Sequence, residues 1–462
     1  MFELNASQTS PSSIREPARD VPVCHDCDIV VAGGSTTGVF AAVAAARLGA
    51  RVAVIEQLGM LGGTATASFV CVWHTLLDAA FSKPVIAGLV AETLSRLRRR
   101  NVLIERPPSP HLHFIFPPAE LAIELDRMVA EAGIRVFLHA RCAAAVKNDA
   151  GRAHAVIIED KSGRRAITAR AFVDATGDGD LVHQLGFETR TAAHLQPPTS
   201  CALVQGLDEL GRQTQGFSLN KVVFDPKYPQ ALRPGFLWHA RLPGADVHMV
   251  AGTRVHGADC SDAGQLTAAE IEGRRQIAAM IDLVRKNVPG GDQFALVALP
   301  ARIGIRETRH AVCLHQLAEK EVLDGTRFTD AIGNGSYRVD VHSSNGDGLV
   351  FRYLDGREEY HTADGRHEER RWRPASEANP AFYQIPYRSL VPRGAENVLV
   401  AGRCIDADEG AFGAVRVMVN TGQMGHAAGV AAWLSLHSAR PVGAIDTAKL
   451  RGLLAQQGAF VL

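Results

Sequence analysis

The stretch from residue 28 to residue 56 constrains the fold more than any other part of the chain. Residues 28–32 (DIVVA) and 51–55 (RVAVI) predict two strands, and residues 39–48 predict an alanine-rich helix between them. The sequence GGSTTG at 33–38 predicts a glycine turn that leads from the first strand into the helix. The second strand runs into Glu56, where a dinucleotide-binding βαβ unit carries an acid. This order predicts a parallel βαβ unit that binds a nucleotide.

The residues of this turn have separate expected roles. Gly33 permits the tight turn, and Gly38 lets the helix approach the sheet, so that N–H groups at the helix start can meet a pyrophosphate. Glu56 is expected to bind a ribose hydroxyl. Ser35 stands where the fingerprint has glycine, and its side chain is expected to crowd the turn. The alternative is an ordinary βαβ unit without a nucleotide.

Two later segments also place a turn directly after a strand. Residues 171–175 (AFVDA) predict a strand that runs into TGDGD at 176–180, and ligands of open α/β folds bind at such carboxyl ends. The acids Asp178 and Asp180 could instead cap the next helix. Residues 397–401 predict a strand before Gly402 and Arg403. Residues 420–422 predict the start of a helix that presents its amino end to a ligand and packs closely through small residues, namely Gly422, Gly425, Ala428 and Gly429.

The remaining patterns predict an α/β fold. Residues 118–132 predict an amphipathic helix, and the runs 134–139, 142–147, 153–159 and 165–174 predict an antiparallel meander. Residues 267–270 (TAAE) predict a capping box for a helix with an apolar stripe of Ile271, Ile277, Ile281 and Val284. We therefore expect a Rossmann-like domain, with a central parallel sheet plus the meander, from 28–199 and 386–440. A mixed α+β substrate domain at 200–385 is inserted in it, and a tail (1–27) and an extension (441–462) flank it.

Charge and cysteine content argue against several classes of protein. The 49 Lys and Arg balance the 49 Asp and Glu, so no positive field points to a nucleic acid. No apolar run reaches the roughly 18 residues of a membrane span, and no signal peptide is evident, which predicts a cytoplasmic protein. The eight cysteines form no framework, and the pair Cys24 and Cys27 lacks a second pair at zinc spacing. We predict reduced thiols and no metal site.

The strand-and-turn segments described above give the chain a resemblance to a known family. Three further segments carry the same resemblance, namely LGGTAT at 61–66, RIGIRETR at 302–309 and YRVDVH at 337–342. From residue 28 to about residue 434 the chain resembles the FAD-dependent oxidoreductases of the glutathione-reductase superfamily, in the branch related to fumarate-reductase-type flavoproteins. The resemblance implies one FAD. Its adenine end would lie on the first turn and near the backbone of Cys142, its diphosphate or ribityl near the second turn, and its ring near the others. The implied residues are Gly33, Gly34, Ser35, Gly38, Glu56, Gly62, Gly63, Thr64, Cys142, Thr176, Gly177, Asp178, Gly402, Arg403, Gly422 and Gln423.

Candidate catalytic residues lie in the middle of the chain. If residues 302–309 are helical, Arg302, Arg306 and Arg309 share a face and could hold a substrate carboxylate. The alternative is that they pair with Glu307, Glu319 and nearby acids on a solvated surface. His342 lies two residues beyond Asp340, so both share one face of a strand, and the loop 343–346 follows. We predict that His342 carries a proton, with His74 as the second candidate.

No second strand, glycine turn and helix fit a nicotinamide cofactor, so direct reduction by NAD(P)H is not expected. FAD would exchange a hydride with a small polar substrate, one that can carry a carboxylate, as a dehydrogenase or oxidase. The electron acceptor stays open between oxygen, a quinone and a protein, and a homo-oligomer is compatible with the sequence. The alternatives are a flavin-containing electron-relay or binding subunit without substrate chemistry, and an FAD with a purely structural role.

Overall fold

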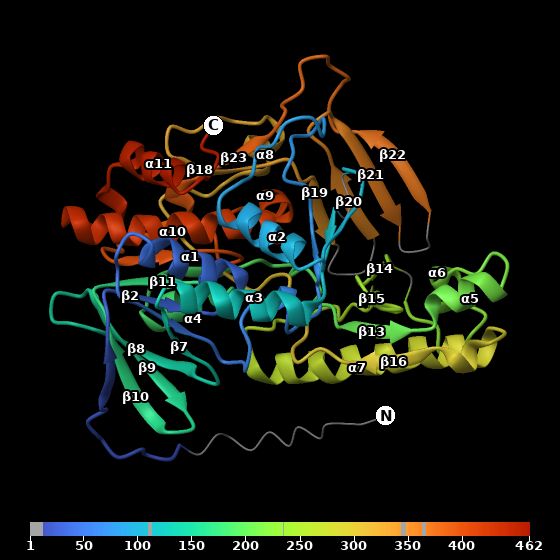
Figure 1. Cartoon of the computed structure of the whole chain (residues 1–462), viewed down its shortest axis with the longest axis horizontal. Helices are drawn as coiled ribbons and strands as arrows, with labels where there is room; N and C mark the ends of the chain where they lie inside the picture. The colour runs from blue at the N-terminus through green and yellow to red at the C-terminus, as the bar shows by residue number, and fades with distance from the viewer. Residues whose placement is uncertain (1–12, 110–112, 234, 343–347, 363–365) are drawn as a thin grey trace.

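The computed structural model describes residues 13–109, 113–233, 235–342, 348–362 and 366–462. Its centre is a five-stranded parallel sheet in the order β24-β11-β2-β3-β7 (Figure 1). All four residues of β2 are apolar and buried, as is typical of a parallel sheet covered on both faces. The strands are β2 (Ile29–Ala32), β3 (Val52–Ile55), β7 (Arg135–Phe137), β11 (Ala171–Asp174) and β24 (Val398–Val400).

Two helices pack closely beside this sheet, α1 (Thr36–Ala46) and α10 (Met418–Ser438). A β-carbon added to Gly425 or Gly429 would lie 2.0 Å from the carbonyl oxygen of Thr37 or Ala41, so only glycine permits this approach. The close packing predicted from the small residues of the second helix is confirmed. It holds the amino ends of both helices near the same edge of the sheet.

The antiparallel meander is confirmed in its central part only. Strands β8 (Arg141–Lys147), β9 (Ala153–Asp160) and β10 (Gly163–Thr168) pair antiparallel, and β1 (Val23–Asp26) joins them parallel to β10. The first predicted run instead forms β7 of the parallel sheet, and the last run is divided between β10 of the meander and β11 of the parallel sheet. The chain changes sheet at Arg170, whose N–H donates to Asp28 O rather than to the meander. Residues 23–26, which the sequence assigns to the tail, form β1 and pair with β10.

Two antiparallel sheets lie within residues 200–385. One contains β14 (Trp238–Arg241), β15 (Val247–Ala251), β13 (Cys201–Gln205) and β16 (Ala295–Ala298), in that order. The long helix α7 (Ala263–Asn287) runs along this sheet (Figure 1). The other sheet contains β19 (Val339–His342), β20 (Gly348–Arg352), β21 (Arg357–Thr362) and β22 (His367–Arg371).

The predicted start of α7 is wrong. Asp262 caps the helix by accepting from the N–H of Gln265 at 2.8 Å, one turn before the expected capping box. Thr267 lies inside the helix and donates to Ala263 O. Of the predicted apolar stripe, Ile271 is 46% exposed, whereas Ile277, Ile281 and Val284 are buried.

Shorter elements complete the fold. The strands are β4 (Val72–Trp73), β5 (Ile104–Glu105), β6 (Phe114–Ile115), β12 (Thr189–Thr191), β17 (Arg309–Ala311), β18 (Ala331–Gly335) and β23 (Tyr383–Pro386). The helices are α2 (Leu89–Arg99), α3 (Pro118–Glu131), α4 (Asp180–Gln184), α5 (Leu207–Gln213), α6 (Leu219–Val223), α8 (Glu319–Leu323), α9 (Glu409–Val415) and α11 (Thr447–Gln456). No helix in these described ranges combines the length and hydropathy of a bilayer crossing. The α/β class with a Rossmann-like βαβ unit is confirmed, and the domain boundaries remain a prediction.

Candidate functional site

A cavity of about 1270 Å³ opens at the carboxyl end of the parallel sheet. One end is lined by the turns after β2, β11 and β24, and the other by residues of the two antiparallel sheets. Ordinary small-molecule pockets measure about 300–1,000 Å³. The cavity is therefore larger than an ordinary pocket for one small molecule.

The first glycine turn is shaped by close backbone contacts. Gly33 adopts a φ of 100°, and a β-carbon there would lie 2.4 Å from Ala175 O. A β-carbon on Gly38 would lie 1.9 Å from Gly33 O, so any larger residue would push the helix out of place. Thr36 and Thr37 line the cavity from the first turn of α1, whose N–H groups have no acceptor within the helix. This is a cradle of the kind that binds a phosphate.

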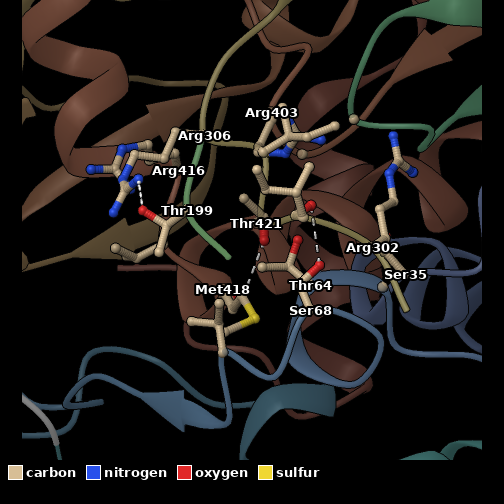
Figure 2. A pocket seen from close by; sticks show the side chains of 18 of the residues that line it. Ser35, Thr64, Ser68, Thr199, Arg302, Arg306, Arg403, Arg416, Met418 and Thr421 are labelled. Carbon is tan, nitrogen blue, oxygen red and sulfur yellow. Dashed lines mark hydrogen bonds between the residues drawn. The ribbon is translucent and has the colours of Figure 1, made fainter. Parts of the chain in front are cut away.

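Ser35 does not obstruct this turn. It is the N-cap of α1, and its Oγ accepts from the N–H of Gly38 at 3.3 Å. The second glycine turn lies against it, because a β-carbon on Gly63 would come within 2.9 Å of Ser35 Cβ. In Figure 2, Thr64 of this second turn faces the interior of the cavity beside Ser68. The serine thus replaces the usual glycine by serving as a cap.

Glu56 is held at the end of β3 by the backbone. Its two carboxylate oxygens accept from the N–H groups of Gly34 and Leu58, each at 2.8 Å. Burial raises the pKa of this carboxyl group above its ordinary value. The residue lines the cavity, as does Cys142. Contact of these two residues with the adenosine end of FAD stays a prediction.

The turn after β11 is fixed by charge. Asp178 accepts from Arg302 Nη2 at 2.8 Å, from Arg403 Nη2 at 3.1 Å and from the hydroxyl of Thr308 at 2.9 Å. Burial alone would raise the pKa of Asp178, but the charges of Arg403 and Arg302 outweigh it, and the pKa lies below its ordinary value. Arg403 Nη1 is buried and has no hydrogen-bond partner among the described residues. A phosphate or flavin oxygen in the cavity would satisfy this donor.

Most of the implied cofactor residues meet around this cavity, but two do not. Thr176, Gly177, Gly402 and the second glycine turn line it, and Gly34 and Gly38 shape its wall. Gly422 instead packs against Phe40 and Val90.

Gln423 also turns away, because its side chain forms two hydrogen bonds with the backbone of Asn334, at 2.8 and 3.1 Å. The helix begins at Met418 rather than at residue 420. Met418 and Thr421 are therefore the residues of α10 that reach the cavity (Figure 2).

The three arginines at 302–309 do not share a helical face. The segment before β17 is not helical, so the side chains diverge. Arg302 binds Asp178, and Arg309 binds the carboxylate of Asp180 at 2.9 Å. Only Arg306 turns to the other end of the cavity. The expected alternative of surface pairs with Glu307 and Glu319 is also wrong, because these acids bind His310 and Arg352.

Within the part of the chain that the structure describes, Arg306 is bound by uncharged groups alone. Its Nη1 donates to Pro197 O and to Thr199 Oγ1, the latter at 2.6 Å (Figure 2). Burial, followed by the charges of Arg254 and Arg416, lowers the pKa of Arg306 to about 9. Three guanidinium groups thus gather at this end of the cavity.

Within the described chain, Asp340 is the only carboxylate that forms an ion pair with any of these three arginines. Arg416 Nη2 lies 3.4 Å from its Oδ2. No described carboxylate forms an ion pair with Arg306 or Arg254. The site therefore carries an excess of positive charge.

His342 lies within this charged group. Its Nδ1 accepts from Arg254 Nε at 3.4 Å, and its Nε2 lies 3.2 Å from Asp340 Oδ1, as expected from their shared strand face. Burial, followed by the charge of Arg306, holds the pKa of His342 well below its ordinary value. Because Nδ1 accepts from an arginine, the hydrogen of a neutral ring belongs on Nε2, which faces the aspartate. The loop 343–346 lies outside the described residues.

His74 reaches the same network through Tyr337. The two rings lie 4.1 Å apart between centroids, and the tyrosine hydroxyl donates to Asp340 Oδ2 at 2.7 Å. Sequence reasoning missed Arg254 and Arg416. The second could have been found, because it interrupts the apolar run at 411–419, where a lone cation indicates burial with a function. The first follows β15 without any such signal.

Known proteins were compared with the chain as a whole. The family model described as FAD dependent oxidoreductase matches residues 28–454. No curated protein matches the chain. Similar solved structures include a geranylgeranyl bacteriochlorophyll reductase-like protein of Thermoplasma acidophilum, at 12% identity over 94% of this chain and 84% of that one, with a TM-score of 0.45. Another is the flavin-dependent brominase Bmp2, at 10% identity over 94% of this chain and 84% of that one, with a TM-score of 0.46. A third is p-nitrophenol 4-monooxygenase PnpA of Pseudomonas putida DLL-E4, at 11% identity over 94% of this chain and 81% of that one, with a TM-score of 0.40.

The family match covers nearly the whole chain, including each segment that lines the cofactor end of the cavity. The protein therefore belongs to the FAD-dependent oxidoreductase family, and its cofactor is FAD.

Proposed function

We propose that this flavoenzyme transfers a hydride between FAD and a small polar substrate that carries a carboxylate, as a dehydrogenase or oxidase. Within the family, the segments 302–309 and 337–342 favour the branch related to fumarate-reductase-type flavoproteins. The observation that carries the proposal is the excess of guanidinium groups at one end of the cavity. Arg306 and Arg254 have no carboxylate partner in the described chain, and Arg416 has only Asp340.

Burying a cation without a counter-ion costs free energy. An anionic ligand that pairs with the cation removes part of this cost, and this strengthens ligand binding. A carboxylate can accept two hydrogen bonds from one guanidinium group, and this geometry favours arginine over lysine. The lowered pKa of Arg306 agrees with this missing counter-ion, since a nearby anion would raise the pKa. We therefore assign the anchor role to Arg306. Arg309, which is bound to Asp180, positions the turn at the cofactor end.

His342 is the proposed proton carrier. The hydrogen bond from Arg254 to its Nδ1 is long at 3.4 Å, so a substrate hydroxyl could replace it. Asp340 would then stabilise the protonated ring, because its carboxylate lies 3.2 Å from Nε2. Asp340 is in turn held by Tyr337, against which His74 packs. We propose that His74 supports this network and does not carry the proton.

FAD supplies the hydride chemistry, and the chain supplies the binding, the orientation and the proton. At the cofactor end, Gly33, Glu56 and Arg403 are the residues expected to hold the dinucleotide, because they line the cavity and offer matching groups. The electron acceptor remains a prediction of oxygen, a quinone or a protein.

The function is tested with purified holoenzyme under anaerobic conditions. Pairs of compounds that differ only by a carboxylate or its amide, drawn from hydroxy acids, amines and sugars, are added to the oxidised flavin. The same pairs are then added to flavin reduced with dithionite. We expect a carboxylate to bleach the oxidised flavin or to reoxidise the reduced one, while its amide does neither. A response to amides alone, or to a protein partner alone, would contradict the proposal, and the latter would indicate an electron-relay subunit.

A further inference from the structure

Three potential metal ligands meet on one face of the sheet β19-β20-β21-β22. Successive strand pairs place His342 opposite Leu349, Leu349 opposite His361, and His361 opposite His367. Glu359 lies two residues before His361 on β21, and alternate residues of a strand share a face. All five of these residues line the cavity. The sheet thus presents a glutamate and two histidines to the same space as the proposed substrate site.

The ligand atoms are close enough for a single ion. Glu359 Oε2 lies 3.6 Å from His361 Nε2 and 3.9 Å from His367 Nε2, and all three atoms lie within 4.8 Å of one another. Zinc holds nitrogen and oxygen ligands at about 2.0–2.2 Å, which corresponds to about 3.4 Å between ligands in a tetrahedron. Side-chain movements of less than about 1 Å would close that difference.

The Nε2 of His361 is buried and has no hydrogen-bond partner within the described chain, and the Glu359 carboxylate lies just beyond hydrogen-bond range at 3.6 Å. The two imidazole rings are stacked, with centroids 4.6 Å apart, so the two histidines lie side by side next to Glu359. Arg357 pairs with Asp355 at 2.7 Å and lies 3.9 Å from the other oxygen of Glu359, Oε1. The Oε2 of Glu359 therefore faces the two histidines.

We propose that Glu359, His361 and His367 bind a divalent first-row transition metal ion, of which Zn²⁺ is representative. Two histidines and one carboxylate are a ligand set for zinc and for non-haem iron(II), and three protein ligands leave at least one coordination position open. Here the open position faces the cavity. Strands lie about 4.8 Å apart, so the ion would lie roughly 10 Å from His342, two strands away on the same face. This inference stands on contacts separate from those of the proposed function.

The test uses the whole chain loaded with FAD. A chelator first removes bound metal, and the protein is then incubated with zinc sulfate and passed through a desalting column. Zinc is then measured by mass spectrometry in the wild type, Glu359→Gln and His367→Gln. The matched control is His248→Gln, which disables a second cluster of Asp208, Asp246 and His248 elsewhere. We expect each site variant, but not the control, to hold about one zinc less per chain than the wild type.

Titration calorimetry gives the affinity. Loss of a direct ligand is expected to weaken zinc binding by more than the roughly 10- to 100-fold that loss of an outer-shell partner costs. Flavin content and thermal unfolding show whether each variant is folded. If His367→Gln fails to fold, the isosteric Glu359→Gln decides. Equal zinc content in the wild type and the folded site variant, loss of zinc in His248→Gln alone, or no uptake by the wild type would overturn the inference.

Discussion

Among the described residues, Arg306 donates only to uncharged oxygens, and burial and two other guanidinium groups lower its pKa to about 9. Such a side chain can bind an anion without first rearranging, because hydrogen bonds with the surrounding protein fix its position and leave its charge unneutralised. Arg302 and Arg309 show the contrast, since each already binds an aspartate at the cofactor end. Within one short segment, only the middle arginine keeps its charge available.

Replacement of this residue tests the contribution of its charge. Hydrogen bonds to charged groups contribute about 1.5–3 kcal/mol, so Arg306→Gln should weaken carboxylate binding by roughly 10- to 100-fold. The dissociation constant is measured by titration of the oxidised flavin spectrum, with the exposed Arg393→Gln as control. Unchanged affinity in Arg306→Gln, with flavin content intact, would remove Arg306 from the substrate site.

His342 is expected to affect the chemical step and not cofactor binding. General acid–base catalysis contributes about 10²- to 10⁴-fold, so His342→Gln should slow flavin reduction, or reoxidation by the substrate, by about that factor. The flavin absorbance should stay intact, and the exposed His154→Gln should behave as the wild type. Rapid-mixing spectroscopy measures the rate, and an unchanged rate would reject the proton-carrier role.

The same histidine predicts a pH dependence of stability. Its folded pKa is lowered by burial and by Arg306, whereas the unfolded chain has a histidine pKa of about 6.5. Its contribution is therefore complete above pH ~6.5 and is lost as the pH falls towards the lower folded pKa, since only the unfolded state takes up the proton.

Urea unfolding of the wild type and His342→Gln between about pH 7 and 5 checks this sign. The wild type should lose up to about 1.4 kcal/mol more per pH unit than the variant. Parallel curves would show that the folded protein also takes up the proton.

At the scale of elements, the sequence patterns correctly predicted the elements that depend on contacts between residues close in sequence. The strand, turn and helix at 28–48 follow from apolar alternation and glycine, and Ser35 fits because it caps the helix. The meander was right only where strands pair with their neighbours in sequence. β7 and β11 instead pair with strands distant in sequence, which no local pattern encodes. The arginines at 302–309 would share a face only in a helix, and this segment is not helical, because their spacing comes without an apolar pattern of helical period.

The packing of α10 on α1 predicts a large effect of one methyl group. In Gly425→Ala the new β-carbon would lie 2.0 Å from Thr37 O, a backbone atom that cannot move without shifting the FAD cradle. We expect destabilisation of at least the ~1–3 kcal/mol typical of overpacking, with weaker FAD binding.

The control is Gly452→Ala in α11, where a β-carbon meets nothing within 4 Å. It should be neutral or stabilising, by up to about 1 kcal/mol, because alanine favours the helix. Thermal unfolding with and without added FAD measures both effects. Equal behaviour of the two variants would show that the helices separate freely.

At the scale of the whole molecule, one cavity joins residues that are hundreds of positions apart. Its cofactor end could be largely predicted, because the glycine turns and Glu56 carry recognisable spacing. Gly422 and Gln423 were misplaced by a helix start that differs by two residues. The positive end could not be predicted, since Arg254, Arg306 and Arg416 come from three separate segments and meet only through the tertiary fold.

The most direct measurement is a titration of the oxidised holoenzyme with a small carboxylate and with its neutral amide, followed through the flavin absorption band. The account predicts that the carboxylate perturbs the band saturably, that the amide does so far more weakly, and that Arg306→Gln abolishes the difference. Equal perturbation by both compounds, or a difference that survives in Arg306→Gln, would contradict the claim that FAD and an anionic substrate share this cavity.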